Sequence, residues 1–232
     1  MKLGKRLTKI EAMVASGYDH IWDCCCDHGL LGAALLARQA AASIHFVDIV
    51  ADIMQQLKTR LHRFYPLVAT SATYCQWYVH CLDAALLPLD SFRGKHLIIL
   101  AGIGGERMAE LVNLIFTKHP SADIDFLLCP VHHQFALRQQ LIALNFSLKT
   151  ETLLKENQRF YEILLVSSGQ PAEPPCQKIH PVGSQLWNTT SEEQRRIAAA
   201  YLDKTLNHYR RIQRNHALQI QPVIDAYGAV KL

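Results

Sequence analysis

The segment at residues 96–105, His-Leu-Ile-Ile-Leu-Ala-Gly-Ile-Gly-Gly, decides the fold. Residues 96–101 are a continuous apolar run of strand length, which is typical of a parallel strand covered by helices on both faces. Gly102, Gly104 and Gly105 follow directly, and glycines let the backbone approach a flat ligand closely. A buried strand followed by a glycine loop predicts a binding site at the carboxyl end of a parallel sheet.

Strand and helix patterns alternate on both sides of this segment. Strands are expected at residues 20–24, 44–47, 73–79, 96–101, 126–129, 147–153 and 160–167, and helices at residues 6–15, 29–40, 51–64, 107–118 and 135–144. Because helices between parallel strands cover both faces of a sheet, this order predicts an α/β fold with a Rossmann-like, doubly wound sheet.

The end of the chain has a different pattern. Residues 168–175, SGQPAEPP, are typical of a linker, and beyond Gly183 the pattern is helical only. Thr190 and Ser191 can cap a helix with a narrow apolar seam, suited to an antiparallel, coiled-coil-like pair or to packing on the sheet. The seam consists of Ala198, Leu202, Thr205, Tyr209 and Ile212. We therefore expect a sheet domain at residues 1–167, a linker at 168–182 and a helical segment at 183–232.

The composition excludes several classes of protein. Half of the 232 residues are hydrophobic and 19% are charged, so the chain can bury a core and is not disordered. No apolar run approaches the length of a membrane span, and the N-terminus lacks the apolar stretch of a signal peptide. Three of the seven cysteines, Cys24 to Cys26, are adjacent in what we interpret as a buried strand. Free thiols in the cytoplasm explain this pattern better than disulfides, and the spacings do not match a metal site.

Positive charge is concentrated at the two ends of the chain. Residues 1–10 carry four Lys and Arg and no acid, and residues 187–232 carry seven against four acids. Basic ends around a near-neutral middle favour a polyanionic partner, although a solvated helix surface would look the same.

Acidic residues mark the first three strand ends. Asp23 and Asp27 belong to the first of these loops, Asp48 follows the second strand and Asp83 the third. Ligands bind at this edge of an open parallel sheet, where an acid about twenty residues after the first loop can bond both hydroxyls of a cofactor ribose. Each acid alone is more often a cap or turn residue. Because the phosphate-binding patterns GxGxxG and GxxxxGK[ST] are absent, the joint pattern favours a nucleoside cofactor without phosphates, which S-adenosylmethionine fits.

Four short motifs carry a family resemblance. They are LGKRL at residues 3–7, Asp23 with Asp27-His28, ILAGIGG at 99–105 and FYEI at 160–163. In order and spacing they resemble the bacterial tRNA (adenine(22)-N(1))-methyltransferases, which typically read LSKRL, DIGSDH, IAGMGG and YEI. The helical C-terminal segment is similar to the coiled-coil-like appendage of that family, so the resemblance covers essentially the whole chain.

The resemblance implies a class I S-adenosylmethionine-dependent methyltransferase that methylates N1 of an adenine at tRNA position 22. Asp27 would be catalytic by stabilising the cationic product, and His28 by orienting Asp27 or the base. The cofactor-binding residues would be Asp23, Cys25, Asp48, Ile49, Asp83, Ala84, Ala101 and Gly102. The substrate-binding residues would be Lys5, Arg6, Gly104, Gly105, Pro130, His132, Tyr161, Arg195, Arg210 and Arg211, with the glycines forming a floor for a flipped base. The expected partner is tRNA, and the expected assembly is a monomer or weak homodimer without a metal.

Two departures from the family pattern bear on function. Cys25 and Cys26 stand where the family has Gly and Ser, so a side chain must be accommodated beside the cofactor. Residues 129–131, Cys-Pro-Val, stand where the family has QPN and are followed by His132 and His133, which affects the base-facing loop. Two alternatives therefore stay open: a methyltransferase of the same fold acting on another RNA or a small molecule, and a tRNA-binding relative without activity.

Overall fold

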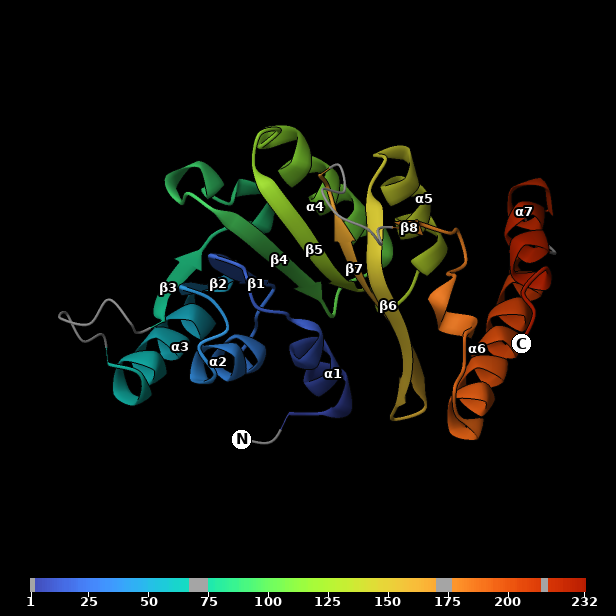
Figure 1. Cartoon of the computed structure of the whole chain (residues 1–232), viewed down its shortest axis with the longest axis horizontal. Coiled ribbons are helices and arrows are strands. Elements are labelled where there is room, and N and C mark those ends of the chain that lie inside the picture. Colours follow the sequence, from blue (N-terminus) through green and yellow to red (C-terminus); the bar gives the residue numbers. More distant parts are fainter. Residues whose placement is uncertain (1–2, 67–74, 170–176, 214–216) are drawn as a thin grey trace.

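The computed structural model describes residues 3–66, 75–169, 177–213 and 217–232. One eight-stranded sheet crosses the molecule, with helices on both faces (Figure 1). The strands are β1 (His20–Cys24), β2 (Ser43–Asp48), β3 (Gln76–Cys81), β4 (Lys95–Ala101), β5 (Asp123–Cys129), β6 (Ser147–Glu156), β7 (Arg159–Ser167) and β8 (Gln177–Lys178). The α-helices are α1 (Lys5–Met13), α2 (Leu30–Ala37), α3 (Ala51–Phe64), α4 (Gly105–Lys118), α5 (Gln134–Ala143), α6 (Glu192–Gln213) and α7 (Ala217–Gly228).

The strand order is β3-β2-β1-β4-β5-β7-β6-β8. The first five strands of the chain are parallel, whereas β7 runs antiparallel to β5 and β6 antiparallel to β7. The chain leaves β1 in one direction to form β2 and β3 and later returns to the other side of β1 with β4. This switch point is where open α/β sheets bind ligands. The predicted doubly wound sheet is confirmed.

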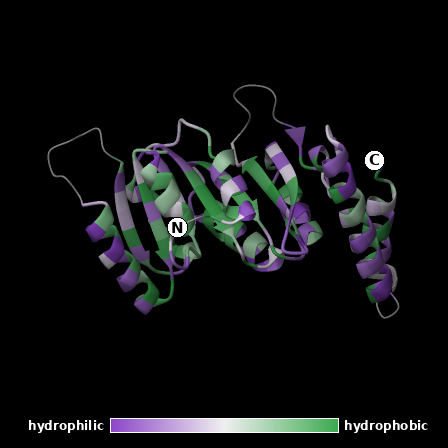
Figure 2. Cartoon of the chain, turned by 90° about the horizontal axis from the view of Figure 1, so that it is seen from below, coloured by the Kyte–Doolittle hydropathy of each residue, from purple (hydrophilic) through white to green (hydrophobic). Residues whose placement is uncertain are grey.

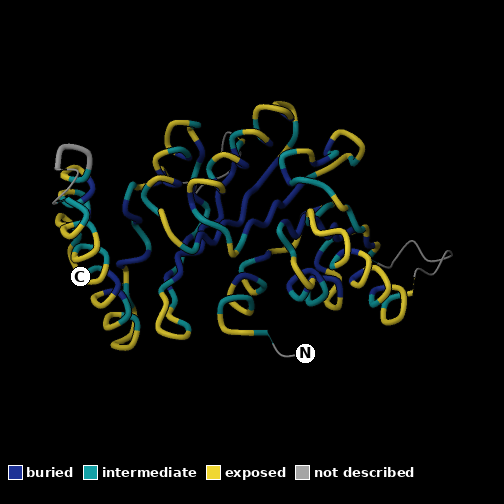
Figure 3. Tube along the Cα trace, turned by 180° about the vertical axis from the view of Figure 1, so that it is seen from behind, coloured by how far each residue is buried: buried dark blue, intermediate teal, exposed yellow. Residues whose placement is uncertain are grey.

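Buried strands and closely packed helices explain the two layers around the sheet. Residues 96–100 of β4 are fully buried, as the continuous apolar run predicts. Gly32 lets α2 lie against β2, because a Cβ at this position would come within 2.4 Å of the Phe46 ring. One core lies between the sheet and α1, α2 and α3, and a second lies between the sheet and α4 and α5. Figure 2 shows the hydrophobic residues along the strands, and Figure 3 shows the same strands buried beneath exposed helix turns.

The observed elements agree with the predicted ones to within a few residues. β1 and α3 have the predicted bounds, and β6 continues to Glu156 to form a long hairpin with β7. The third strand begins at Gln76 and ends at Cys81, later than predicted, and residues 73–74 lie outside the described residues. Within the part of the chain that the structure describes, no helix is long and apolar enough to cross a membrane.

A cluster of histidines lies on one face of the sheet, across β1, β2 and β3. The His20 ring bonds the Ser43 hydroxyl at 2.6 Å, the same hydroxyl bonds His45 at 3.0 Å, and His45 bonds His80 at 3.0 Å. The His45 ring also stacks on Trp22, with ring centroids 3.8 Å apart. Burial, together with the neighbouring histidines, lowers the pKa of His45 to about 2, so this ring is neutral near pH 7.

The C-terminal helices form an antiparallel pair that packs on the end of the sheet. Tyr209 of α6 stacks on Tyr227 of α7, and Gln213 bonds Gln221, so the two helices run in opposite directions. The predicted seam is wider than expected, because Tyr201 is buried beside Ala198. The seam predicted either an antiparallel pair or packing on the sheet, and both are present. The pair packs on β6 and on the turn at Gln185–Trp187.

A buried polar network ties this pair to the sheet. The Arg138 guanidinium donates to Glu162 at 2.8 Å and to Glu151 at 2.6 Å, and none of the three side chains is exposed. The Tyr201 hydroxyl of α6 donates to the other oxygen of Glu162 at 2.6 Å. Burial acts to raise the pKa of Glu151, but Arg138 and the N–H groups that it accepts outweigh burial and hold this pKa below its usual range.

The expected linker at residues 168–182 is more than a spacer. Residues 170–176 lie outside the described residues, but Gln177 and Lys178 form β8, which pairs with β6. Ile179 is buried in the core beside α4 and α5. The described end of this segment is therefore part of the sheet domain's packing.

Candidate active site

The acidic and glycine loops meet at one edge of the sheet. Cys24 pairs with Val47 on one side and Leu100 on the other, and Asp48 pairs with Cys81. Since these strands are parallel, the residues that follow them lie at the same edge, on both sides of the switch point. The predicted convergence of these loops is present.

The loop after β1 has an unusual backbone. Cys25, Asp27 and Gly29 have φ values of 55°, 49° and 66°, in the left-handed region that favours glycine. The Asp48 carboxylate stabilises this loop, because one oxygen accepts the Asp27 N–H at 3.1 Å and the other accepts the Val50 N–H at 3.2 Å. Asp48 therefore joins the loops after β1 and β2, in addition to any bond that it makes to a ligand.

Asp23 lies beneath this loop. It is buried in β1, and its carboxylate accepts the N–H of Gly32 at 2.8 Å. Burial raises the pKa of Asp23 to about 7, with Asp48 adding to the effect and the Gly32 bond opposing it. In this position Asp23 braces the first turn of α2, and a direct bond to a cofactor stays a prediction.

The cysteines of this edge are free, and their raised pKa values keep them as protonated thiols rather than nucleophilic thiolates. Only Cys24 belongs to the strand, whereas Cys25 and Cys26 lie in the half-buried turn after it, so the expected run of three strand cysteines was wrong. Burial and the charges of Asp48, Asp23 and Asp83 raise the pKa of Cys25 to about 11. A thiol with that pKa is protonated near pH 7 and unreactive.

Arg107 is a residue of this edge that the sequence patterns did not single out. Its guanidinium donates to Asp83 at 3.1 Å and to Glu110 at 2.6 Å. The other Asp83 oxygen accepts the N–H of Ala85 at 2.9 Å, and Ala84 is buried behind it. A ligand amine that reaches Asp83 thus shares this carboxylate with Arg107. A cation near this edge could have been predicted from the sequence, because three acids that gather at one edge are stabilised by a nearby positive charge.

The residues at this edge fit the nucleoside part of a cofactor. The Ile49 side chain is 69% exposed directly after Asp48, which provides an apolar surface for a base beside an acceptor for ribose hydroxyls. Gly102 has a φ of 88°, and a Cβ there would meet only the Arg6 guanidinium, at 3.9 Å. Ala101 precedes it and is half-buried. The space above Gly102 is thus open to a ligand.

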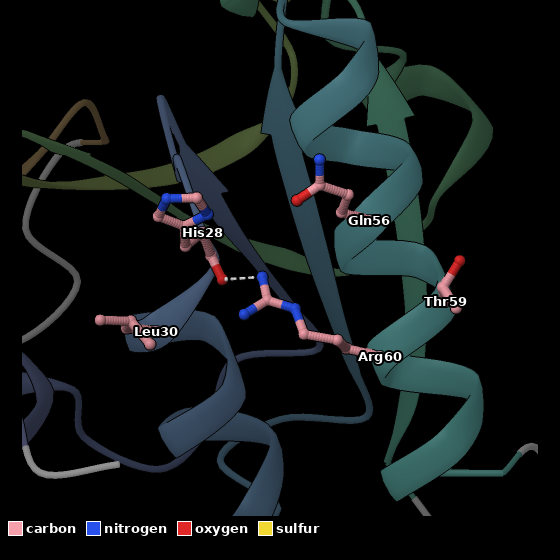
Figure 4. Close-up of a pocket in the computed structure, with 5 residues that line it drawn as sticks. All are labelled: His28, Leu30, Gln56, Thr59 and Arg60. Carbon is pink, nitrogen blue, oxygen red and sulfur yellow. Dashed lines mark hydrogen bonds between the residues drawn. The ribbon is translucent and has the colours of Figure 1, made fainter.

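Asp27 and His28 project from the same edge. Their side chains are 69% and 54% exposed, and His28 Nε2 lies 3.7 Å from Asp27 Oδ1. The backbone of His28 is held from the other side, because its carbonyl accepts a hydrogen bond from Arg60 of α3 at 2.9 Å (Figure 4). The pair is therefore fixed by its backbone while its side chains face solvent.

The glycine loop after β4 is joined to the loop after β5. The Gly105 N–H donates to the His132 carbonyl at 2.8 Å, and the Val131 N–H donates to the Ile103 carbonyl at 3.0 Å. A Cβ on Gly104 would lie 2.4 Å from the His132 ring, and one on Gly105 would lie 2.3 Å from the His133 carbonyl. The expected open glycine floor is therefore limited to Gly102, since His132 covers Gly104 and backbone covers Gly105.

The other expected substrate residues differ in exposure. Arg6 lies over the Tyr161 ring at 5.1 Å, which brings α1 to the buried Tyr161 of β7 and to the space above Gly102. Lys5 is exposed beside it, whereas Pro130 is buried and offers no side-chain surface to a substrate. On α6, Arg195, Arg210 and Arg211 are all exposed.

Comparison with known proteins places this fold in a defined class. The model of the methyltransferase domain family matches residues 3–164. A putative tRNA (m1A22) methyltransferase from Streptococcus pneumoniae shares 19% identity over 98% of both chains, with a TM-score of 0.74. TrmK from M. capricolum, solved with S-adenosyl-homocysteine, shares 15% identity over 98% of this chain and 96% of its own, with a TM-score of 0.71. The m1A22 tRNA methyltransferase TrmK from B. subtilis shares 16% identity over 98% and 94%, with a TM-score of 0.64. No curated protein matches the chain in sequence.

The parallel sheet, its switch point and the acidic loops define a Rossmann-like methyltransferase fold. The chain belongs to the methyltransferase domain family.

Proposed function

We propose that this protein is an S-adenosylmethionine-dependent tRNA methyltransferase that modifies N1 of an adenine, at position 22 of the tRNA. One observation carries the proposal. The likeness to tRNA (m1A22) methyltransferases covers 98% of the chain, so it includes the C-terminal helices as well as the sheet. A likeness limited to the sheet would support only a methyltransferase fold.

The loops after β1 to β4 would hold the cofactor. Asp48 would accept hydrogen bonds from the ribose hydroxyls, Ile49 would contact the adenine, and Asp83 would accept from the exocyclic amine. Cys25 and Gly102 would line the space between these loops. S-adenosylmethionine supplies an electrophilic methyl group for transfer to a nucleophilic nitrogen. This assignment is supported by the exposed Ile49 and by the carboxylates that gather at one edge.

The residues around Gly102 would align the acceptor base. The N1 lone pair of adenine lies in the ring plane and is available in the neutral base, so the attack needs no strong general base. Alignment of two reactants can contribute on the order of 7–11 kcal/mol. Gly102 leaves room for a flat ring, with the Arg6–Tyr161 pair on one side and His132 on Gly104 on the other.

Asp27 would act on the charge that develops during the reaction. Methylation at N1 produces a cationic base, and a nearby carboxylate stabilises that charge. Asp27 is exposed at the same edge, with its backbone N–H held by Asp48 and His28 beside it. His28 would orient the Asp27 carboxylate or the base.

The tRNA would extend from this edge onto the C-terminal helices. Arg195 and Arg210 are exposed on α6, where they can contact phosphates, which give affinity rather than sequence information. Lys5 and Arg6 would add positive charge from α1. A tRNA substrate would place the protein in the cytoplasm.

The loop after β5 bears on which RNA the protein modifies. Val131 stands where the family pattern has an Asn, and the next residue, His132, places its imidazole against Gly104. This observation favours, as a second candidate, a methyltransferase of the same fold that acts on a different RNA site.

The experiment is methyl transfer from labelled S-adenosylmethionine to tRNA transcripts that differ only at position 22. A transcript with A22 should receive about one methyl group, found as 1-methyladenosine after digestion, whereas one with G22 should receive none. Equal labelling of the two transcripts would support the second candidate. Absence of transfer to any RNA, with tRNA binding retained, would support an inactive tRNA-binding relative.

A further inference from the structure

A second hollow lies beside the candidate active site, between the loop after β5 and the helix α6. It is an open groove of about 900 Å³ with three walls. One wall is the loop at residues 131–134, the second is the start of β7 at Arg159 and Phe160, and the third is a face of α6. Figure 1 shows α6 alongside the β6–β7 end of the sheet.

The floor of the groove is aromatic. Phe160 and Tyr201 have ring centroids 5.6 Å apart, and Tyr209 lies 6.0 Å from Tyr227. Tyr201 and Tyr227 are buried, while Phe160 and Tyr209 are half-buried and present part of their surface to the groove. Aromatic surfaces of this kind bind nucleobases by stacking, with little preference for one base.

The rim of the groove is cationic. Arg159, Lys204 and Arg211 are exposed along it, and none of them forms an ion pair with another residue that the structure describes. The Lys204 ammonium lies 5.5 Å from the Phe160 ring, so charge and aromatic surface adjoin. Asp203 is the single acid among the lining residues. Unpaired cations around an aromatic floor complement a stretch of nucleic acid backbone with an unstacked base.

The groove and the candidate active site share a wall. His132 lies against Gly104 at the methyltransferase edge and also lines the groove. Across the groove, His208 of α6 lines it together with His133 of the same loop. Burial, together with the charges of Arg211 and His133, lowers the pKa of His208. A strand that placed one base above Gly102 would therefore continue directly into the groove.

We propose that this groove binds the RNA nucleotide that neighbours the methylated adenine, with its phosphate on the Lys204–Arg211 rim and its base against Phe160. The inference rests on the proposed function, because it takes the ligand to be RNA. It adds a separate site for the unpaired nucleotide next to the methylated adenine. The inner face of α6 then positions the substrate, while Arg195 and Arg210 lie outside the groove lining.

The test compares variants in the full-length protein. The double variant Lys204→Gln/Arg211→Gln removes two rim charges, and Phe160→Leu removes the aromatic face while keeping an apolar side chain. The matched control is Arg93→Gln/Lys118→Gln, which removes two exposed cations outside the groove. Calorimetric binding of S-adenosylhomocysteine should be the same in all four proteins, which shows that the fold and the cofactor site are intact.

Binding of the A22 transcript is then measured at several salt concentrations. The rim variant should bind about tenfold more weakly, and its logarithmic salt slope should fall by about 1.4, since each lost phosphate contact on a single strand contributes about 0.7. It should raise the KM for tRNA with little change in kcat. A transcript with 2-aminopurine next to A22 should change its fluorescence on binding wild type, and this change should be lost with Phe160→Leu.

The results separate this site from the proposed function. If wild type methylates A22 but the rim and Phe160 variants behave like the control, the groove does not hold RNA and the proposed function stands. If wild type does not bind tRNA, both fail. If the groove variants instead lose self-association, seen by sedimentation, while tRNA binding is unchanged, the groove is an interface between copies of the chain.

Discussion

Replacement of Tyr201 by Phe tests how the C-terminal helices are attached to the sheet. The substitution removes one hydroxyl, which donates to the buried Glu162 carboxylate at 2.6 Å. A hydrogen bond to a charged group contributes about 1.5–3 kcal/mol, and here the acceptor is left buried. The stacking of this ring on Trp187, with centroids 5.9 Å apart, is retained. Tyr201→Phe should therefore lower the free energy of unfolding by about 1.5–3 kcal/mol.

The assay is urea denaturation followed by tryptophan fluorescence and by circular dichroism. Trp187 lies against Tyr201 and adds a signal from the helical segment to the signals of Trp22 and Trp77 in the sheet, whereas circular dichroism reports on the secondary structure of the whole chain. Tyr209→Phe is the matched control, because the Tyr209 hydroxyl makes no hydrogen bond within the described residues. If both variants unfold within about 0.5 kcal/mol of wild type, as surface substitutions do, the reasoning about the network is refuted.

Three further predictions concern the edge loop, the Asp27–His28 pair and the histidine cluster. Cys25→Gly should raise the free energy of unfolding by about 0.5–1 kcal/mol in urea, since it removes about 1–2 kcal/mol of left-handed strain and adds about 0.5–1 kcal/mol of chain entropy. It should also tighten S-adenosylhomocysteine binding in calorimetry, and a weaker affinity would show that the thiol is useful. Asp27→Asn should leave that affinity unchanged and slow methyl transfer about 100-fold, so an equal loss of both would make Asp27 a cofactor ligand. Burial lowers the pKa of His45 to about 2 and of His96 to about 4, so their stabilising contribution is complete above pH 6.5 and is lost as the pH falls toward 4. In this range each histidine makes the free energy of unfolding rise by about 1.4 kcal/mol per pH unit. Asp23 opposes them with a slope of the same size, because its pKa is raised to about 7 and its contribution to stability is lost as the pH rises from about 4 through 7. His45→Gln should reduce the slope between pH 6 and 5 by about 1.4 kcal/mol per unit, and an unchanged slope would show that His45 titrates normally.

The sheet and the edge at which its acidic loops meet were predictable because their signals are local. An apolar run of strand length, such as residues 96–101, marks a buried strand, and the strand order that follows is a property of the fold class. Asp48 is the last residue of β2 and Asp83 lies two residues after β3, so their convergence depends only on the strands being parallel. Such features need no knowledge of side-chain partners.

Contacts between distant residues could not be predicted in the same way. The composition of residues 168–175 indicates a boundary, but nothing in it reveals that Tyr201 donates to Glu162, 39 residues away in the sequence. For this reason we expect that a chain cut at residue 168 would not fold well, since Glu162 would lose a buried donor. The contact of His132 with Gly104 could not be predicted from the sequence either, because it depends on how two separate loops meet.

The central claim is that a nucleoside cofactor binds at the edge where β1, β2 and β4 end, and calorimetric titration with S-adenosylhomocysteine tests it most directly. Wild type should bind one equivalent. Asp48→Ala should lose at least about tenfold in affinity, since two hydrogen bonds to a charged acceptor are removed. Asp52→Ala, which removes an exposed carboxylate four residues further along the chain, should bind like wild type. An absence of binding by wild type, or equal affinities for the two variants, would contradict the account.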